Sequence, residues 1–380
     1  MIGFLYITSE GGHEVPGGVT MLFAALLVGM IACLALEEKL HAKKSIIVGI
    51  FAIVAMFLGA VFGLLPFEDA THIPLGGHEI SLPIYIPAID WGVIAIIVGS
   101  SLFVDVTSRS GLFSWIAIKL TKLSGGDPVK LLWLYGLMTV VFSAVLNNVT
   151  AMIIVGSLTG VSLNKLGKKD LLLGFLLTMG LLTNIGGLLT LISSVPNIIV
   201  GTTAGISFVT FFIKASPYVL VATVLTIWMG AKIFGIKPLN GEDEIKAARE
   251  LVEGFDENDG IESKGFFYFG AFMLLAFICV IATTSVLPYI SNLGMGFVAL
   301  AFAGIMLLRF KHDVNTFYRS LDWDLMAFFC ALFMVIYVME QAQVLAMIGV
   351  GLEQLISLGD TAGSGAILIA AAAASSVTDN

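Results

Sequence analysis

Two stretches of polar and glycine residues interrupt otherwise apolar parts of the sequence, and their residue types could bind a small ion or solute. The first contains Asn147–Asn148 and the second contains Gly186–Gly187. Side-chain amides and hydroxyls can replace part of a hydration shell, while a broken helix offers N–H groups to anions and carbonyls to cations. The glycines permit unusual φ values and close backbone approach. We therefore predict a binding site made of Asn147, Asn148, Thr150, Asn184, Gly186, Gly187, Pro196 and Asn197.

A third polar cluster lies at the end of the chain and adds a second half to the predicted site. It consists of Ser375, Ser376, Asp379 and Asn380. A carboxylate within an alanine-rich span is costly in lipid, so Asp379 is a candidate to bind a cation or carry a proton. Two alternatives stay open: the polar side chains could simply hydrogen-bond between helices, and Asp379 could lie in a hydrated loop. We predict no catalytic residue and no metal site.

The composition places the elements that carry these residues in a membrane. The chain is 58% hydrophobic and only 12% charged, with a mean hydropathy of +1.00, whereas soluble domains are about 45–50% apolar and about 25% charged. A spanning helix needs about 20 apolar residues, and apolar runs recur from residues 19–36 to 364–378. The sequence therefore predicts an all-α polytopic membrane protein.

Run lengths and positive charges predict the topology. The runs 131–146 and 150–163 are short for separate crossings, which favours a re-entrant hairpin with its tip at 147–150. With the N-terminus outside, 18 of the 19 Lys and Arg residues fall in predicted inner segments. Two full crossings would preserve this parity, so charge alone does not decide for the hairpin. We expect a multi-pass protein of the cell (inner) membrane with its N-terminus outside.

A weak internal repeat relates the two polar tips. Asp90–Trp91 and Asp322–Trp323 each open an apolar block, and the same offset places Asn147–Asn148 on Asp379–Asn380. The span after Trp91 is predicted to run inward and the span after Trp323 outward, so the two blocks have inverted topology. Inverted repeats with broken helices are typical of secondary transporters. Because the first repeat continues to about Gly235, we expect a longer protein whose C-terminal repeat is truncated at Asn380.

The net charge of −8 arises largely from one hydrophilic segment. Nine acidic residues lie between positions 242 and 262: Glu242, Asp243, Glu244, Glu250, Glu253, Asp256, Glu257, Asp259 and Glu262. Such a run is typical of a solvated linker, and residues 244–253 could form a short amphipathic helix. We predict N-terminal helices at 1–84, a first inverted repeat at 85–237 with its broken helix at 184–197, an acidic cytoplasmic linker at 238–264, scaffold helices at 265–321 and an incomplete second repeat at 322–380.

Four motifs resemble the ion transporter superfamily: Asp90-Trp91-Gly92, Leu146-Asn147-Asn148-Val149-Thr150, Asn184-Ile185-Gly186-Gly187 and Pro196-Asn197-Ile198-Ile199. Within the superfamily, the chain is most similar to the melanosomal P protein and arsenite permease-like group. Citrate and divalent-anion transporters and D-type sodium/proton antiporters are more distant relatives. The resemblance implies two inverted repeats, each with a re-entrant hairpin and a broken helix, in a dimer that moves like an elevator.

The resemblance also implies that the hairpin tip and the break in the next helix hold the ion together. This sequence departs from the group in two places: Asn147 stands where an Asp is usual, and Ser194 stands where the group has an acid before Pro-Pro-Asn. Both changes remove a carboxylate near the predicted site. They put tight cation or proton coupling through the first repeat in question and favour an anionic or neutral oxyanion solute.

These observations predict a secondary active transporter of a small, anionic or oxyanion solute that uses elevator-like alternating access. A sodium/proton antiporter is the alternative within transporters, and an intramembrane enzyme or a channel is the alternative from another class. The sequence contains no Walker A loop, H-E-x-x-H or G-x-S-x-G motif. The expected partners are the lipid bilayer, a small solute and a second copy in a homodimer, with no nucleic acid; no cofactor is expected beyond a coupling sodium ion or proton.

Overall fold

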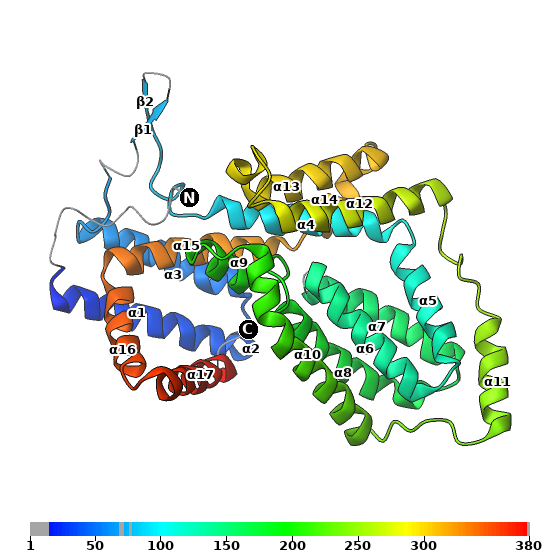
Figure 1. The fold of residues 1–380 in the computed structure, drawn as a ribbon. Coiled ribbons are helices and arrows are strands. Elements are labelled where there is room, and N and C mark those ends of the chain that lie inside the picture. The colour runs from blue at the N-terminus through cyan, green and yellow to red at the C-terminus, as the bar shows by residue number, and fades with distance from the viewer. Residues whose placement is uncertain (1–14, 68–71, 76–77, 147, 378–380) are drawn as a thin grey trace. The chain divides into compact units, whose positions relative to one another are not determined.

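The computed structural model describes residues 15–67, 72–75, 78–146 and 148–377, which are helical apart from one short hairpin and the connecting turns (Figure 1). Nine of the helices in this described part are long and apolar enough to cross a membrane. The predicted all-α polytopic fold is therefore confirmed. The hairpin pairs β1 (His72–Leu75) with β2 (His78–Ser81) in antiparallel register, with His72 opposite Ser81.

The described residues fall into two compact units, each of which is described by itself. Unit 2 comprises residues 7–94 and 322–380. Its helices are α1 (Gly17–Ala35), α2 (Glu37–Leu40), α3 (Lys44–Val61), α15 (Trp323–Gln341), α16 (Val344–Ile356) and α17 (Asp360–Val377). Apolar side chains of α1, α3 and α15, such as Phe23, Val48 and Val338, are fully buried in its core. Segments from the two ends of the sequence therefore share one core.

The helices α3 and α15 of unit 2 pack in parallel. In their first turns the Ser45 hydroxyl donates to Asp324 Oδ1 at 2.5 Å. Near their other ends Gly59 faces Val338, and a Cβ at Gly59 would lie 3.3 Å from that side chain. The absence of a side chain at Gly59 thus lets the two helices stay close over most of their length.

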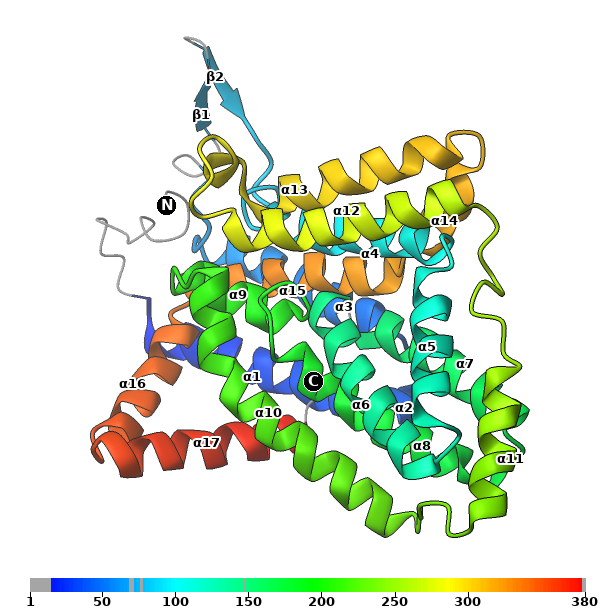
Figure 2. The ribbon, with the colours of Figure 1, turned by 45° about the vertical axis from the view of Figure 1, so that its right-hand side comes forward.

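Unit 1 contains residues 95–321, and α4 begins just before its boundary. Its elements are α4 (Trp91–Ser108), α5 (Leu112–Ser124), α6 (Pro128–Val145), α7 (Asn148–Lys165), η1 (Lys169–Leu171), α8 (Leu172–Gly187), α9 (Val195–Thr203), α10 (Phe208–Ile233), α11 (Glu242–Glu253), α12 (Lys264–Thr283), α13 (Ile290–Leu307), η2 (Leu308–Phe310) and α14 (Val314–Ser320). The helices α6, α8 and α10 lie side by side (Figures 1 and 2).

The predicted hairpin is an antiparallel pair formed by α6 and α7. Near its base Tyr135 and Ser162 hydrogen-bond at 2.7 Å, and near its tip Ser143 and Asn148 hydrogen-bond at 2.9 Å. Each helix has 18 residues, which is longer than the apolar runs, because Asp127 caps the start of α6 and α7 continues to Lys165. Helices of this length reach about 27 Å, so the re-entrant path remains a prediction.

Because α4 packs closely against α13 within unit 1, a larger residue at Gly99 should lower the stability of the fold. A Cβ at Gly99 would lie 2.5 Å from the backbone of Ala299 and Leu300. We expect Gly99→Ala to force the helices apart and to lower the free energy of unfolding by about 1–3 kcal/mol, the usual cost of overpacking. Thermal unfolding in detergent measures this change. Gly304→Ala on α13 is the control, because no atom of the described residues lies within 4 Å of its Cβ position; equal midpoints for the two variants would contradict the prediction.

Candidate functional site

The tip of the α6–α7 hairpin meets the end of α8. The Asn148 side chain, in the first turn of α7, donates from Nδ2 to Asn184 Oδ1 at 3.2 Å. Asn148 is half-buried and Asn184 is exposed on the described chain, so a ligand can reach both amides. The structure thus brings together the two polar stretches that the sequence singled out, although they are 36 residues apart.

Ser143, which begins the first polar stretch but is not among the predicted site residues, joins this stretch to the second. Its Oγ lies 2.9 Å from Asn148 Oδ1 and 2.5 Å from the carbonyl oxygen of Thr183. A hydroxyl carries one proton and can donate to only one of these acceptors at a time. When it donates to Thr183, the Asn148 amide oxygen is left to accept from, or coordinate, a ligand. The sequence feature that could have identified Ser143 is that it is the last hydroxyl of an apolar run before the tip.

Two glycines let α8 approach the hairpin. A Cβ at Gly186 would lie 2.6 Å from the carbonyl oxygen of Val140, and a Cβ at Gly187 would overlap the Asn148 amide, lying 2.9 Å from its Nδ2. The predicted close backbone approach is therefore confirmed. The unusual φ values that glycine permits are not used, because both glycines are helical residues of α8 and neither has a positive φ. Space, rather than backbone conformation, requires glycine at these positions.

The predicted break in the next helix lies between Gly187, where α8 ends, and Val195, where α9 begins. Side chains satisfy the carbonyl groups that this break exposes. Asn197 Nδ2 donates to the carbonyls of Gly187 at 2.7 Å and Thr190 at 2.9 Å. Ser193 Oγ lies 2.6 and 3.0 Å from the same two oxygens and can donate to either one. Polar backbone at membrane depth needs such internal partners. Asn197 is buried and therefore shapes the break.

A further hydrogen bond joins the break between α8 and α9 to the hairpin. The Thr190 hydroxyl donates to the carbonyl oxygen of Ala144, near the end of α6. Thr190 is buried, so this bond is shielded from competing water. The tip and the break consequently form one connected hydrogen-bonded structure.

Two helix N-termini face this structure. The first turn of α7 begins with Asn148, which packs on Gly187, and the first turn of α9 contains Asn197, which bonds the carbonyl of the same Gly187. Helix N-termini carry a partial positive charge and unpaired N–H groups, which favour anions. The carboxyl end of α8 carries the opposite partial charge and favours a cation. The partial charges at these helix ends would therefore favour an anion beside a cation.

The remaining predicted residues are placed as follows. Thr150 lies in the first turn of α7, half-buried, and Pro196 lies exposed in the first turn of α9. Ser375 and Ser376 belong to the backbone of α17, but their side chains are not described. Asn147, Asp379 and Asn380 lie outside the described residues. Of the first half of the predicted site, Asn148, Asn184, Gly186, Gly187 and Asn197 thus lie together within unit 1, and the second half remains a prediction.

Comparison with known proteins shows which protein family the chain belongs to. The family described as "Citrate transporter" matches residues 19–380. An uncharacterized transporter of Mycobacterium tuberculosis is 28% identical over 293 residues, which cover 77% of this chain and 66% of that protein. A 46 kDa membrane protein of Mycobacterium leprae is 28% identical over 250 residues, covering 65% of this chain and 56% of that protein.

The P protein of Mus musculus is 29% identical over 188 residues, covering 48% of this chain and 22% of that protein. The chain therefore spans just under two thirds of the length of the mycobacterial transporter and much less of the P protein. The resemblance to the ion transporter superfamily and to the P protein group is confirmed. The names of the family and of the Mycobacterium tuberculosis relative describe transporters rather than enzymes, and the chain belongs to the citrate transporter family.

Proposed function

We propose that the protein is a secondary active transporter that carries a small anionic or oxyanion solute across the membrane by elevator-like alternating access. The observation that carries the proposal is the hydrogen bond between Asn148 and Asn184, which joins the hairpin tip to the broken helix. Around it lie two helix N-termini that favour negative charge. Membership in the citrate transporter family supports the same solute class.

A carboxylate such as citrate is the first solute to test. The family description supplies the candidate, and the donors at the site suit it, because helix N–H groups and amide NH₂ groups bind carboxylate oxygens. Asn147 and Ser194 are neutral where the related group has acids. Their neutrality avoids repulsion of an incoming anion.

We propose a sodium ion rather than a proton as the coupling ion at this half of the site. The oxygens available around the tip are those of amides, hydroxyls and backbone carbonyls, such as Asn148 Oδ1 and Ser143 Oγ. These groups can coordinate a cation, but they do not exchange protons near neutral pH. Asp379, in the predicted second half, remains the candidate for proton coupling.

The positive charges in the sequence support a multi-pass protein of the cell (inner) membrane, and we propose that its N-terminus lies outside. The resemblance to the ion transporter superfamily leads us to propose a homodimer. In this arrangement the lipid bilayer contacts the outward-facing apolar side chains of the spanning helices.

Uptake by proteoliposomes tests the proposal. The purified full-length protein is reconstituted, and uptake of radiolabelled citrate, smaller dicarboxylates and inorganic oxyanions is measured under an inward sodium gradient, an inward proton gradient or neither. We expect saturable uptake of at least one anion that is accelerated by the sodium gradient. Proton efflux driven by sodium without any anion would instead support an antiporter, and a non-saturating conductance that ignores both gradients would support a channel.

A further inference from the structure

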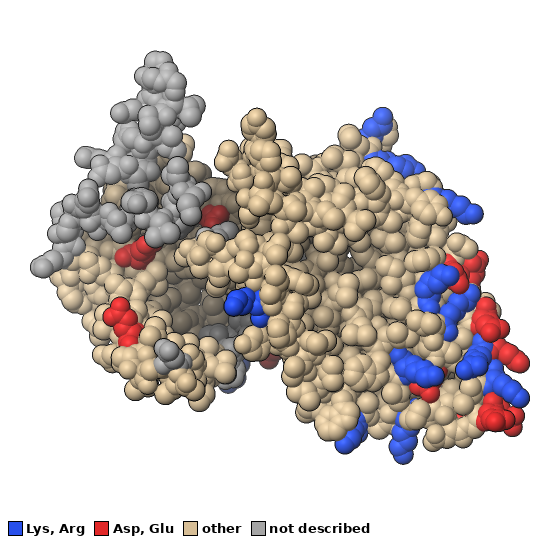
Figure 3. Space-filling model, in the orientation of Figure 1, with Lys and Arg blue, Asp and Glu red and all other residues tan. Residues whose placement is uncertain are grey.

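The acidic segment between α10 and α12 lies along α5 instead of extending freely from unit 1. We call residues 239–261 the strap. At its start the Leu239 N–H donates to Asp127 Oδ2 at 3.0 Å, and within it Val252 is buried. The helix α11 within the strap runs beside α5 (Figure 2), which confirms the predicted short helix in this segment. Oppositely charged side chains gather on this side of unit 1 (Figure 3).

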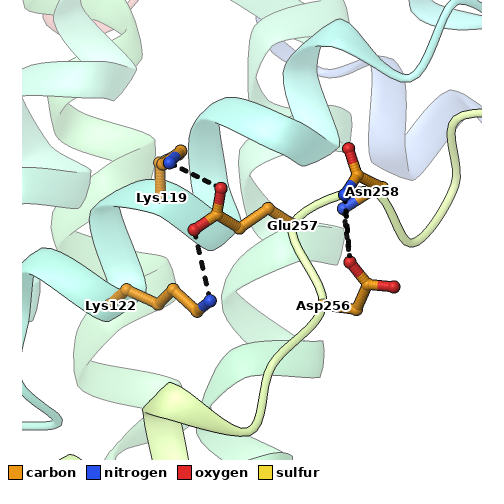
Figure 4. A network of polar contacts seen from close by, with 5 residues as sticks. All are labelled: Lys119, Lys122, Asp256, Glu257 and Asn258. Carbon is orange, nitrogen blue, oxygen red and sulfur yellow. Dashed lines mark hydrogen bonds and ion pairs between the residues drawn. The ribbon is translucent and has the colours of Figure 1, made fainter. Parts of the chain in front are cut away.

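One carboxylate of the strap holds two lysines of α5. Glu257 Oε2 lies 2.5 Å from Lys119 Nζ and Glu257 Oε1 lies 3.2 Å from Lys122 Nζ (Figure 4). Hydrogen bonds from Lys119 and then Lys122 hold the pKa of the Glu257 carboxyl below its usual range. A lowered pKa means that these bonds persist at neutral pH and are lost only as the pH falls through the lowered value. Glu257 is therefore ionised and bound under physiological conditions.

Further contacts align the strap with the whole length of α5. Just before α5, a Cβ at Gly111 would lie 2.6 Å from the carbonyl oxygen of Gly260, and just after it, a Cβ at Gly126 would lie 2.8 Å from Ala248. Lys165, the last residue of α7, lies 3.9 Å from Asp259 Oδ2. The strap therefore reaches both ends of α5 and the base of the hairpin.

The opposite face of α5 packs on the hairpin. The rings of Phe113 and Phe142 are 5.0 Å apart between centroids. Deeper in the interface the Thr121 hydroxyl lies 2.9 Å from Tyr135 OH, which in turn lies 2.7 Å from Ser162 Oγ. All three of these polar side chains are buried, so they fix α5 to both arms of the hairpin.

A continuous series of contacts therefore connects the strap to the tip. It runs from Glu257 to Lys119 and Lys122, along α5 to Phe113, and across to Phe142. Phe142 directly precedes Ser143, whose hydroxyl contacts Asn148. Any displacement of α5 by the strap would thus act one residue away from the site.

We infer that the strap is a latch: the bonds of Glu257 to Lys119 and Lys122 hold α5 against the α6–α7 hairpin, keep the tip site assembled, and release reversibly. The claim that the latch affects transport rests on the proposed function, whereas the claim that it holds α5 against the hairpin does not. Side-chain exposures of 46% for Lys119, 27% for Lys122 and 25% for Glu257 place the bonds within reach of water and salt. Exposed ion pairs are weak and screened by salt, which suits a contact that opens and closes.

Charge reversal with rescue tests the latch directly. Glu257→Lys places a third cation beside Lys119 and Lys122, whereas adding Lys119→Glu and Lys122→Glu restores opposite charges. Glu253→Lys is the matched control, because Glu253 is an exposed acid of the same strap that forms no ion pair within the described part of the chain. Hydrogen–deuterium exchange of the full chain in nanodiscs reports on opening without requiring transport.

We expect amides of α5 and of the tip, residues 142–152, to exchange about fivefold faster in Glu257→Lys, in keeping with the loss of two exposed ion pairs. The triple reversal should restore wild-type exchange, and Glu253→Lys should not change it. Raising the salt from 50 to 500 mM should accelerate exchange in the wild type but not in Glu257→Lys. Unchanged tip exchange in Glu257→Lys, or failure of the triple reversal to restore it, would overturn the latch.

Measurements of solute uptake distinguish a failure of the latch from a failure of the proposed function. If a solute is transported, Glu257→Lys should raise its KM by the factor by which it lowers the fraction of protein with an assembled site, and the triple reversal should return KM to the wild-type value. An unchanged KM in a variant whose exchange shows a largely open tip would overturn the connection between latch and site. If no variant transports any solute, the proposed function fails, while the exchange experiment still decides whether the latch exists.

Discussion

Gly187→Ala should reduce solute uptake by about 100-fold or more while leaving the protein folded. The added Cβ would occupy the space of the Asn148 amide, which lies 2.9 Å away at Nδ2 and closer at Oδ1. Asn148 would have to swing away and lose its bond to Asn184. A displacement of about 1 Å at a binding site can cost about 100-fold in rate. Uptake into proteoliposomes, with size-exclusion chromatography as the check on folding, measures the effect.

The matched control for this variant lies on the same helix. A Cβ at Gly180 of α8 would have no atom within 4 Å in the part of the chain that the structure describes, so Gly180→Ala adds the same methyl group without a collision and should retain wild-type uptake. Normal uptake by a well-folded Gly187→Ala protein would show that the close approach of α8 to Asn148 has no role in transport.

Asn197→Asp should destabilise the break between α8 and α9 and remove most uptake. The substitution preserves the shape of the side chain but replaces the NH₂ donor by an acceptor. The carbonyls of Gly187 and Thr190 would then face a carboxylate oxygen instead of Nδ2, which now donates to both. Because Asn197 is buried, the loss of its two hydrogen bonds and the burial of a charge that faces two carbonyl oxygens should cost at least about 1–3 kcal/mol. Thermal unfolding and uptake, measured on the same preparation, should both decline.

Asn164→Asp is the comparison for this change. Asn164 lies exposed near the end of α7, so the same replacement there should leave the unfolding midpoint and uptake nearly unchanged. The role assigned to Asn197 would be refuted if both aspartate variants behaved like the wild type.

Much of unit 1 could be predicted from residue types alone. Apolar runs mark spanning helices because lipid imposes their length and composition, and Asn147–Asn148 and Gly186–Gly187 stand out because polar or small residues are conspicuous in such runs. The ends of α6 and α7 were harder to predict from the sequence. Asp127 and Lys165 extend these helices beyond the apolar runs, since capping and charged last turns lie outside a hydropathy signal.

Long-range contacts could not be predicted in the same way. Ser143 resembles many hydroxyls that bond within their own helix, as Thr139 does with the carbonyl of Tyr135. The approach of α8 gives it Thr183 as a partner, and the turn of the hairpin gives it Asn148. Likewise, an acidic linker was expected, but its attachment to Lys119 and Lys122 depends on α5 lying beside it. The grouping of residues 7–94 with 322–380 in one unit follows from packing between distant segments, which local patterns do not encode.

The central claim is that the hairpin tip and the broken helix bind the transported species together, and a double-mutant cycle on Asn148 and Asn184 tests it most directly. KM and maximal uptake are measured for the wild type, Asn148→Ala, Asn184→Ala and the double variant in proteoliposomes. Residues that share one site are coupled, so each single change should raise KM at least about tenfold and the double change should cost clearly less than the product of the two. Multiplicative effects, or wild-type KM in either single variant, would contradict the claim that these two amides form one binding site.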